Sequence, residues 1–246
     1  MAREIRRPKK LINPGKYCAG CGHGIVNRVL CEVLEEKGLL DRNIICMGVG
    51  CSCNVRIIDG DVLQCSHGRA AATARGIKAC LPDVFVCTYQ GDGDSYVIGI
   101  EHTINAAYQK ANILMITINN SNFGMTGGQM AWTTLPGQVT TTSPYGRPLD
   151  GPRPIQVPEM IANNLDPAFV ARGGVHSPAE INKLKTYMRE AVEAQMNNEG
   201  FCMIEVCCPC PTNWGMSVEK AYEHVRTKVE EYYPLGVLKA RTKKEV

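Results

Sequence analysis

Three short, strongly apolar runs constrain the fold of this chain more than any other feature. They are IICMGV (residues 44–49), VFVCTY (84–89) and ILMITI (113–118), and each ends at glycine or polar residues. Runs that are apolar throughout, rather than alternating, are typical of strands whose two faces are both buried, as in a parallel sheet. We therefore expect parallel strands that are covered by helices on both sides.

Helix-compatible stretches separate these runs. They lie at residues 69–79 and 96–109, and an amphipathic stretch at 24–37 precedes the first run and ends before Gly38, a typical C-terminal cap. Alternating strands and helices favour a doubly wound, mainly parallel α/β sheet. In this fold class ligands bind at the carboxyl ends of the strands.

The second half of the chain completes the same domain. Residues 126–158 are rich in Gly, Pro, Thr and Ser and lack periodicity, which predicts a long functional or interface loop. A helix is expected at 179–197, a strand at 201–206 and a helix at 218–232. Because no linker is visible and 246 residues suit one large core, we expect a single domain over residues 1–246.

Composition excludes several function classes. Hydrophobic residues make up 44% of the chain and charged residues 21%, and no apolar run approaches the roughly 18 residues of a membrane span. The net charge of +3 comes without a basic stripe and interleaved aromatic residues, so we expect no nucleic-acid binding. The basic start MAREIRRPKK is not followed by an apolar signal stretch, which predicts a cytoplasmic location.

Two polar motifs follow neighbouring predicted strands. The first is GDGD, with Gly91 and Gly93 able to bring backbone N–H groups close to phosphate oxygens. The second is NNSN, which contains Asn120 and Asn122. Asp92, the Asn120 amide oxygen and a backbone carbonyl near Asn122 could supply the protein ligands of Mg²⁺. GDG alone is a weak signal, because tight turns also contain it, but GDGD followed by NN is much stronger.

The chain has thirteen cysteines, an odd number that argues against a disulfide framework and for thiolate ligands. Cys18 and Cys21 form a CxxC motif before the first predicted helix, while Cys51 and Cys210 each follow a predicted strand. Such a set could hold an iron–sulfur cluster or zinc, and CxxC alone could also form a redox disulfide. The spacing leaves these alternatives open.

Six motifs together resemble the β subunit of the 2-oxoacid:ferredoxin oxidoreductases, over nearly the whole chain: CAGCGHG, GVGC, HGRAAATARGIK, GDGD with NN, GMTGGQ and PCPTNW. The resemblance implies bound thiamine diphosphate, Mg²⁺ and one 4Fe-4S cluster. It further implies oxidative decarboxylation of a 2-oxoacid to acyl-CoA and CO₂, with electrons passing to the cluster and then to ferredoxin. GMTGGQ and PCPTNW look more like the 2-oxoglutarate and branched-chain 2-oxoacid branches than the pyruvate branch.

The resemblance also assigns site residues. It implies cluster ligands at Cys18, Cys21, Cys51 and Cys210, although Cys53, Cys207 and Cys208 lie near enough in sequence to substitute for one of them. It implies Mg²⁺ ligands at Asp92, Asn120 and Asn122. The implied cofactor contacts are Cys51, Ser52, His67, Gly91, Asp92, Gly93, Asp94, Asn120, Asn122, Gly124, Met125 and Thr126.

The candidate catalytic residues are His67, Thr126 and Gln129. His67 could donate an N–H to a phosphate oxygen, or it could cap a helix instead. For Thr126 and Gln129, the alternatives are a loop over the active site and a simple glycine turn. His23 could tune the cluster or pocket, or be structural. Arg147 could meet a substrate carboxylate or serve an interface.

One family component has no match in this chain. Thiamine activation in the family uses a glutamate beside the aminopyrimidine, and the family carries it on an α subunit. We therefore expect an α subunit as partner, with γ and ferredoxin-like δ subunits, ferredoxin, CoA and a 2-oxoacid as further candidates. The alternatives are a pyruvate- or indolepyruvate-specific member, a non-oxidative thiamine-dependent decarboxylase, and a zinc-stabilised Rossmann-like binding module.

Overall fold

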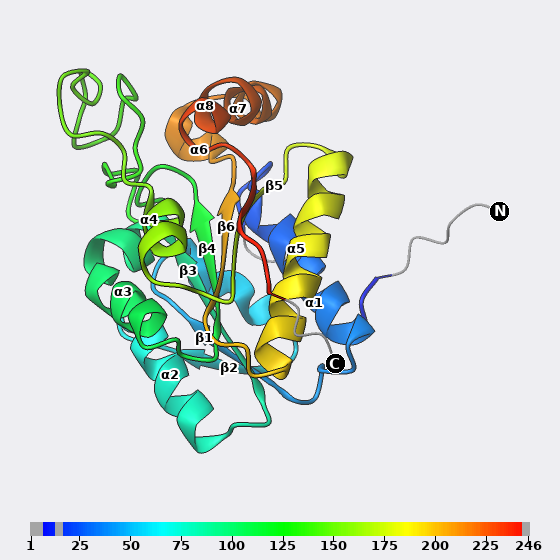
Figure 1. Ribbon diagram of the computed structural model, residues 1–246. Coiled ribbons are helices and arrows are strands. Elements are labelled where there is room, and N and C mark those ends of the chain that lie inside the picture. The colour runs from blue at the N-terminus through cyan, green and yellow to red at the C-terminus, as the bar shows by residue number, and fades with distance from the viewer. Residues whose placement is uncertain (1–6, 13–16, 243–246) are drawn as a thin grey trace.

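A computed structural model describes residues 7–12 and 17–242 (Figure 1). Within these residues one sheet has the strand order β2-β1-β3-β4-β6-β5-β7. Every neighbouring pair is parallel except β5 and β7, which are antiparallel. The expected doubly wound, mainly parallel α/β sheet is confirmed. The strands are β1 Asn43–Met47, β2 Asp61–Gln64, β3 Phe85–Gly91, β4 Leu114–Asn119, β5 Phe169–Gly174, β6 Cys202–Cys207 and β7 Gly236–Lys239.

Helices cover both faces of the sheet, α1 and α5 on one and α2, α3 and α4 on the other (Figure 1). The α-helices are α1 His23–Glu36, α2 Ala70–Cys80, α3 Ile100–Tyr108, α4 Val157–Asn164, α5 Pro178–Met196, α6 Pro211–Trp214, α7 Val218–His224 and α8 Glu230–Tyr232. A 3₁₀ helix spans Cys51–Ile57, and π-helical turns span Gly93–Ile98 and Val225–Val229.

The unbroken apolar runs are explained by this two-sided coverage. In β4, Leu114 and Ile116 pack in the cluster that contains α1 and α5, whereas Met115 packs with α2, α3 and α4. Successive side chains of a strand point to opposite faces, so a strand covered on both sides needs apolar residues at every position.

Several elements differ from the sequence-based expectation. The short edge strands β2 and β7, the inner strand β5 and helix α4 were not expected. The expected helix 96–109 begins instead as the π-helical turn, and 218–232 contains a second one. The N-terminal stretch behind the cytoplasmic expectation lies largely outside the described residues. No helix in the described part of the chain is long and apolar enough to cross a membrane.

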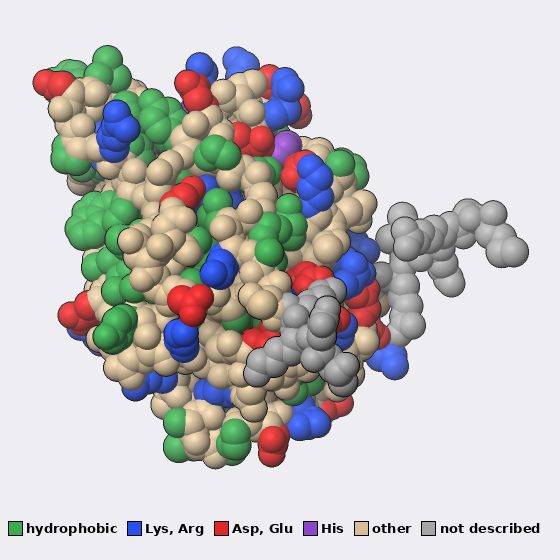
Figure 2. Space-filling model, viewed as in Figure 1, with side chains coloured by type: hydrophobic (Ala, Val, Ile, Leu, Met, Phe, Trp, Pro, Cys, Tyr) green, Lys and Arg blue, Asp and Glu red, His purple; other side chains and the backbone are tan. Residues whose placement is uncertain are grey.

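The segment between β4 and α4 projects beyond the carboxyl end of the sheet (Figure 1). It has no helix or named strand before α4 begins at Val157, as the sequence predicted for most of this region. Apolar side chains gather on this projection (Figure 2), including the fully exposed Tyr145 and the largely exposed Leu149.

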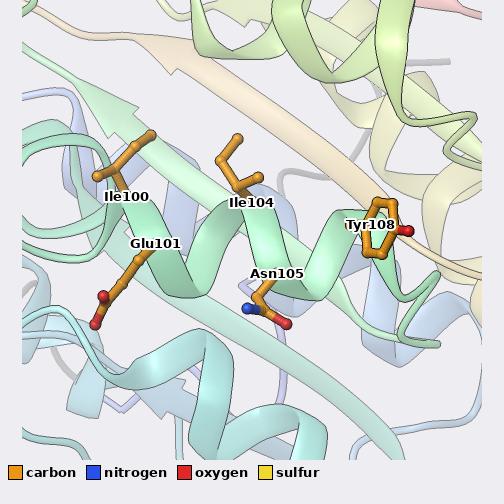
Figure 3. Close-up of a pocket in the computed structure, with 5 residues that line it drawn as sticks. All are labelled: Ile100, Glu101, Ile104, Asn105 and Tyr108. Atoms are coloured by element: carbon orange, nitrogen blue, oxygen red, sulfur yellow. The ribbon is translucent and has the colours of Figure 1, made fainter.

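A hollow of about 380 Å³ lies along the outer surface of α3. Ile100 and Ile104 project to one side of this helix, and Glu101 and Asn105 project to the other (Figure 3). The hollow follows the flank of a helix instead of the strand ends, so it is not the expected ligand site.

A buried ion pair joins β5 to β6. Arg172 and Glu205 are register partners on the two strands, both side chains are fully buried, and the Arg172 Nε donates to a Glu205 carboxylate oxygen. Glu159 of α4 accepts from both terminal nitrogens of Arg172, at 2.6 and 2.7 Å. The second Glu205 oxygen accepts from the Asn119 amide at 3.3 Å, which connects the pair to the end of β4.

We expect Arg172→Met to lower the free energy of unfolding by about 3–5 kcal/mol, because it leaves the Glu205 carboxylate buried without its cation. The double variant R172M/E205L should recover most of that loss, since an apolar pair of similar volume is often as stable as a buried ion pair. Urea denaturation of the wild type, R172M, E205L and the double variant measures this. A double variant that loses as much as the sum of the single variants would contradict it.

Candidate functional site

A crevice lies at the carboxyl ends of β1, β3 and β4, where the fold class places ligands. Its enclosed part measures about 100 Å³. Sixteen residues line it: His23, Val49, Gly50, Cys51, Ser52, His67, Gly91, Asp92, Gly93, Asp94, Asn120, Asn122, Phe123, Gly124, Met125 and Thr126. All twelve residues expected to contact the cofactor are among them, and the contact itself stays a prediction.

Three lining residues escaped the sequence analysis: Val49, Gly50 and Phe123. Val49 belongs to the expected strand 44–49 and Gly50 to the GVGC motif, but neither was expected to line the crevice. Phe123 follows the NNSN motif, and a Cβ atom at Gly93 would lie within 2.8 Å of carbons of its ring. Only glycine permits this approach of GDGD to the aromatic ring, which closes one wall of the crevice.

Asp92 lies directly after β3 and is almost fully buried. Burial raises the pKa of its carboxyl group to about 7, although hydrogen bonds, first among them that from Thr133, act in the opposite direction. The Thr133 hydroxyl donates to Oδ2 of Asp92. Oδ1 remains on the side of Asn120.

The side-chain amide of Asn120 meets two oxygen atoms. One of its terminal atoms lies 2.9 Å from the backbone oxygen of Asn122 and 3.2 Å from Oδ1 of Asp92. If this terminal atom is the amide nitrogen, it donates to both of those oxygens. If it is the amide oxygen, the side chain of Asn120, the Asn122 carbonyl and the Asp92 carboxylate present three oxygens to one another. Mg²⁺ bonds of about 2.0–2.1 Å in an octahedron separate adjacent ligand oxygens by about 2.9 Å. The donor set therefore fits Mg²⁺ with the Asn120 oxygen turned inward.

Asp94 is bound by the protein on several sides. Its carboxylate accepts from the backbone N–H of Gly68 at 2.9 Å, from the Gln90 amide at 2.5 Å and from the backbone N–H of Val49 at 3.3 Å. It also contacts Nδ1 of His67. The carboxylate thus joins the loops after β1, β2 and β3, and it fixes the orientation of the His67 ring at the crevice wall.

His23 is buried beside the crevice. Its Nδ1 lies 3.0 Å from the Tyr89 hydroxyl, and its ring stacks on Tyr17 with 5.0 Å between ring centres. Burial lowers the pKa of His23 to about 4, so the ring is neutral near pH 7. The residue both supports the site and lines it.

Thr126 and Gln129 bind to each other. The Thr126 hydroxyl donates to the Gln129 side-chain oxygen at 2.5 Å, and the Gln129 amide donates to the Thr126 carbonyl at 2.8 Å. Thr126 lines the crevice, whereas Gln129 is not among the lining residues. Their catalytic roles stay predictions, with Gln129 acting at most through Thr126 in this arrangement.

Arg147 binds backbone carbonyls of its own segment. Its guanidinium donates to the carbonyls of Trp132 at 3.0 Å and Pro152 at 2.6 Å, and also to that of Thr134. These three bonds hold the projecting segment together. These bonds give Arg147 a structural role, and its expected roles at a substrate carboxylate or at an interface stay predictions.

Thr133 and Thr134 anchor the same segment to the site, a role that the sequence analysis missed. Both are fully buried; the Thr134 hydroxyl donates to the Ser121 carbonyl at 2.7 Å, and the Tyr233 hydroxyl donates to the Thr133 carbonyl at 3.0 Å. In the sequence, the only sign of this anchoring role was a pair of adjacent threonines in an otherwise irregular stretch.

The four expected cluster ligands come from three regions: Cys18 and Cys21 before α1, Cys51 at the start of the 3₁₀ helix, and Cys210 before α6. Burial, and after it the neighbouring thiols of Cys210, Cys51 and Cys18, raise the pKa of the Cys21 thiol to about 12. The pKa of Cys51 is raised to about 11 by burial and then by Cys210, Cys18 and Cys53. The four thiols and that of Cys53 thus lie close enough to influence one another electrostatically.

The other candidate cysteines differ in position. Cys208 packs against Gly22, the residue after Cys21, so closely that a Cβ atom on Gly22 would collide with its sulfur. Cys207 packs with Leu135 and Tyr233 in a separate apolar cluster. No three His, Cys, Asp or Glu side chains of the described residues are arranged to hold a single metal ion. An iron–sulfur cluster is larger than an ion and takes four thiolates, which suits the donor set.

Comparison with known proteins identifies the class first. Residues 46–206 match the family model of the thiamine pyrophosphate enzymes, C-terminal TPP binding domain. The fold and the crevice therefore belong to a thiamine-pyrophosphate-binding protein.

Relatives narrow this class. The ketoisovalerate oxidoreductase subunit VorA of Methanothermobacter thermautotrophicus is 37% identical over 92% of this chain and 48% of its own length. The 2-oxoglutarate synthase subunit KorB of Archaeoglobus fulgidus is 34% identical over 87% of this chain and 76% of its own. The chain belongs to the 2-oxoacid:ferredoxin oxidoreductase family, as its β subunit, which confirms the resemblance.

A solved structure agrees with this assignment. The 2-oxoglutarate:ferredoxin oxidoreductase from Magnetococcus marinus, with 2-oxoglutarate, coenzyme A and succinyl-CoA bound, superposes with a TM-score of 0.77 at 25% identity. The similarity covers 99% of this chain and 88% of that one. By contrast, this chain spans only about half the length of the VorA relatives.

We expect Thr133→Val to weaken divalent-metal binding by about ten- to a hundredfold in the presence of thiamine diphosphate, because a hydrogen bond to a charged group contributes about 1.5–3 kcal/mol. Binding of Mn²⁺, followed by electron paramagnetic resonance, measures the change without turnover. Thr134→Val is the matched control, since it removes a buried hydroxyl of the same segment that does not contact Asp92. Equal weakening in both variants would show that anchoring of the segment, and not the bond to Asp92, matters.

Proposed function

We propose that this chain is the β subunit of a CoA-dependent 2-oxoacid:ferredoxin oxidoreductase, which converts a 2-oxoacid to acyl-CoA and CO₂. One observation carries the proposal: Asp92 and Cys51 line the same crevice. A hard oxygen site for a metal diphosphate therefore adjoins a thiol of the four-cysteine group. A non-oxidative thiamine enzyme needs the first but has no use for the second.

In this proposal thiamine diphosphate lies in the crevice, and Asp92, the Asn120 side chain and the Asn122 carbonyl hold Mg²⁺ against its diphosphate. When bound, thiamine supplies a nucleophilic carbon and an electron sink for decarboxylation. Asp94 fixes the ring of His67, whose remaining ring nitrogen would be available to the diphosphate. His23 stays neutral at pH 7, so it adds no charge to the pocket.

Cys18, Cys21, Cys51 and Cys210 would hold one 4Fe-4S cluster, which would supply one-electron transfer toward ferredoxin. Cys51 lies close to the loop of residues 120–124 that follows β4, here called the thiamine loop: its sulfur is 3.3 Å from where a Cβ atom of Gly124 would be. This proximity supports a short path between thiamine and the cluster. Cys53 and Cys208 are nearby thiols that could replace a ligand.

A partner completes the site. The enclosed volume of about 100 Å³ is well below the roughly 300–1,000 Å³ of pockets that bury a drug-sized ligand, so this chain supplies only part of the walls. An α subunit that carries the activating glutamate would supply the rest, and γ and ferredoxin-like δ subunits remain candidates. The exposed apolar side chains of the projecting segment suit contact with such a partner.

The proposed substrate is 2-oxoglutarate or a branched-chain 2-oxoacid. The names of the VorA and KorB relatives support both. Pyruvate and indolepyruvate are the alternatives within the family.

We expect the co-purified complex to reduce ferredoxin anaerobically with CoA and either 2-oxoglutarate or 2-oxoisovalerate, and more slowly with pyruvate or indolepyruvate. The chain purified alone should show no turnover, because it lacks the activating glutamate. Acyl-CoA formation and ferredoxin absorbance measure both. Full turnover by the isolated chain would refute the shared site, and CO₂ release without ferredoxin reduction would favour a non-oxidative decarboxylase.

We expect Cys18→Ala to abolish the cluster of this chain, so that its iron content and visible absorbance fall, because Cys18 is a ligand in the proposal. Cys53→Ala is the matched control and should retain both. Iron analysis of the isolated subunit measures the difference. Loss of iron in the control alone would exchange the roles of the two cysteines.

A further inference from the structure

The short helix α6 lies between Cys210 and the loop that follows β4. Its Asn213 amide nitrogen is 2.8 Å from the Gly124 carbonyl and 3.5 Å from the Cys210 sulfur. The same nitrogen is 3.4 Å from the Asn122 side-chain oxygen. One amide therefore faces both a cluster-ligand candidate and the loop at the crevice.

Asn213 is held in place by its neighbours. A Cβ atom at Gly128 would lie 3.1 Å from the Asn213 Cβ, and Gly128 has φ +82°, a backbone conformation that favours glycine. The adjacent Trp214 donates its indole N–H to the Asn120 carbonyl at 3.1 Å. The PTNW turn is thus packed against GMTGGQ and hydrogen-bonded to the NNSNFG loop.

We infer that Asn213 is a positioning residue that donates one amide hydrogen to the Cys210 thiolate and the other to the Gly124 carbonyl. It thereby raises the reduction potential of the cluster and fixes the cluster relative to the thiamine loop. The inference rests on the proposed function, since it takes Cys210 as a ligand.

The physical reason lies in charge. Reduction adds an electron to the cluster, and a hydrogen bond to a ligand sulfur stabilises the more negative state; such bonds are one of the factors that set cluster potentials. An amide has two hydrogens, so the bond to Gly124 leaves one, which faces both the Cys210 sulfur at 3.5 Å and the Asn122 side-chain oxygen at 3.4 Å. A charged thiolate is the stronger acceptor of the two. At 3.5 Å, the separation is that of a hydrogen bond to sulfur.

The test is a redox titration of the co-purified complex, following the electron paramagnetic resonance signal that Cys18→Ala removes. Asn213→Leu keeps the side-chain size but removes both donors, and we expect its midpoint potential to fall by an amount on the order of 59 mV, a tenfold change for a one-electron couple. Asn213→Gln, which keeps the amide, should lie closer to wild type. Trp214→Phe is the matched control from the same helix: it loses the bond to Asn120, and its potential should not change.

Iron content separates the possible outcomes. An unchanged potential in an N213L protein with full iron overturns the inference, as does an equal shift in W214F. If N213L loses its iron, the titration is repeated with Asn213→Ser, which keeps a small donor. Loss of iron from both variants also overturns the inference, because a residue that only tunes the cluster is not required to hold it. Wild-type complex without this cluster signal would instead refute the proposed function.

Discussion

Parallel pairing of β1, β3, β4 and β6 is the constraint on which the rest of this structure depends. Parallel strands deliver their carboxyl ends to one edge, so the residues that follow them meet although they are far apart in sequence. Asp92 follows β3, Asn120 follows β4, and Cys51 and Cys210 follow β1 and β6 after short loops. Strand order therefore makes the oxygen site a neighbour of Cys51 and Cys210, whereas Cys18 and Cys21 are brought to them by the segment before α1.

Strand ends place these residues, and buried polar groups then orient them. Arg172, Glu205 and Asn119 form a continuous series of bonds that reaches the residue before Asn120. Thr133, supported by Tyr233, holds one oxygen of Asp92. Each of these groups is buried, so each needs a partner to offset the free-energy cost of leaving water. The same requirement that stabilises the fold thus sets the geometry of the crevice.

The sequence predicts what depends on local pattern. Apolar runs predicted β1, β3, β4 and β6, and the motifs after them predicted the crevice residues. It did not predict β5, because Arg172 interrupts the apolar pattern and is tolerated only through carboxylates from β6 and α4. Nor did it predict Thr133, which contacts a residue 41 positions away. Such roles depend on tertiary approach, which no short window of sequence contains.

Asn122 shows how closely the two proposed cofactor environments are connected. Its backbone oxygen belongs to the set that faces Asn120 and Asp92, while its side-chain oxygen lies 4.0 Å from the Cys210 sulfur. A hard cation and a thiolate-bound cluster prefer different ligands, so a single residue can serve both sides only by using different atoms. Because the loop is short and begins at a buried strand, neither side can move far without the other. The separation between the two proposed groups is then a property of this one loop.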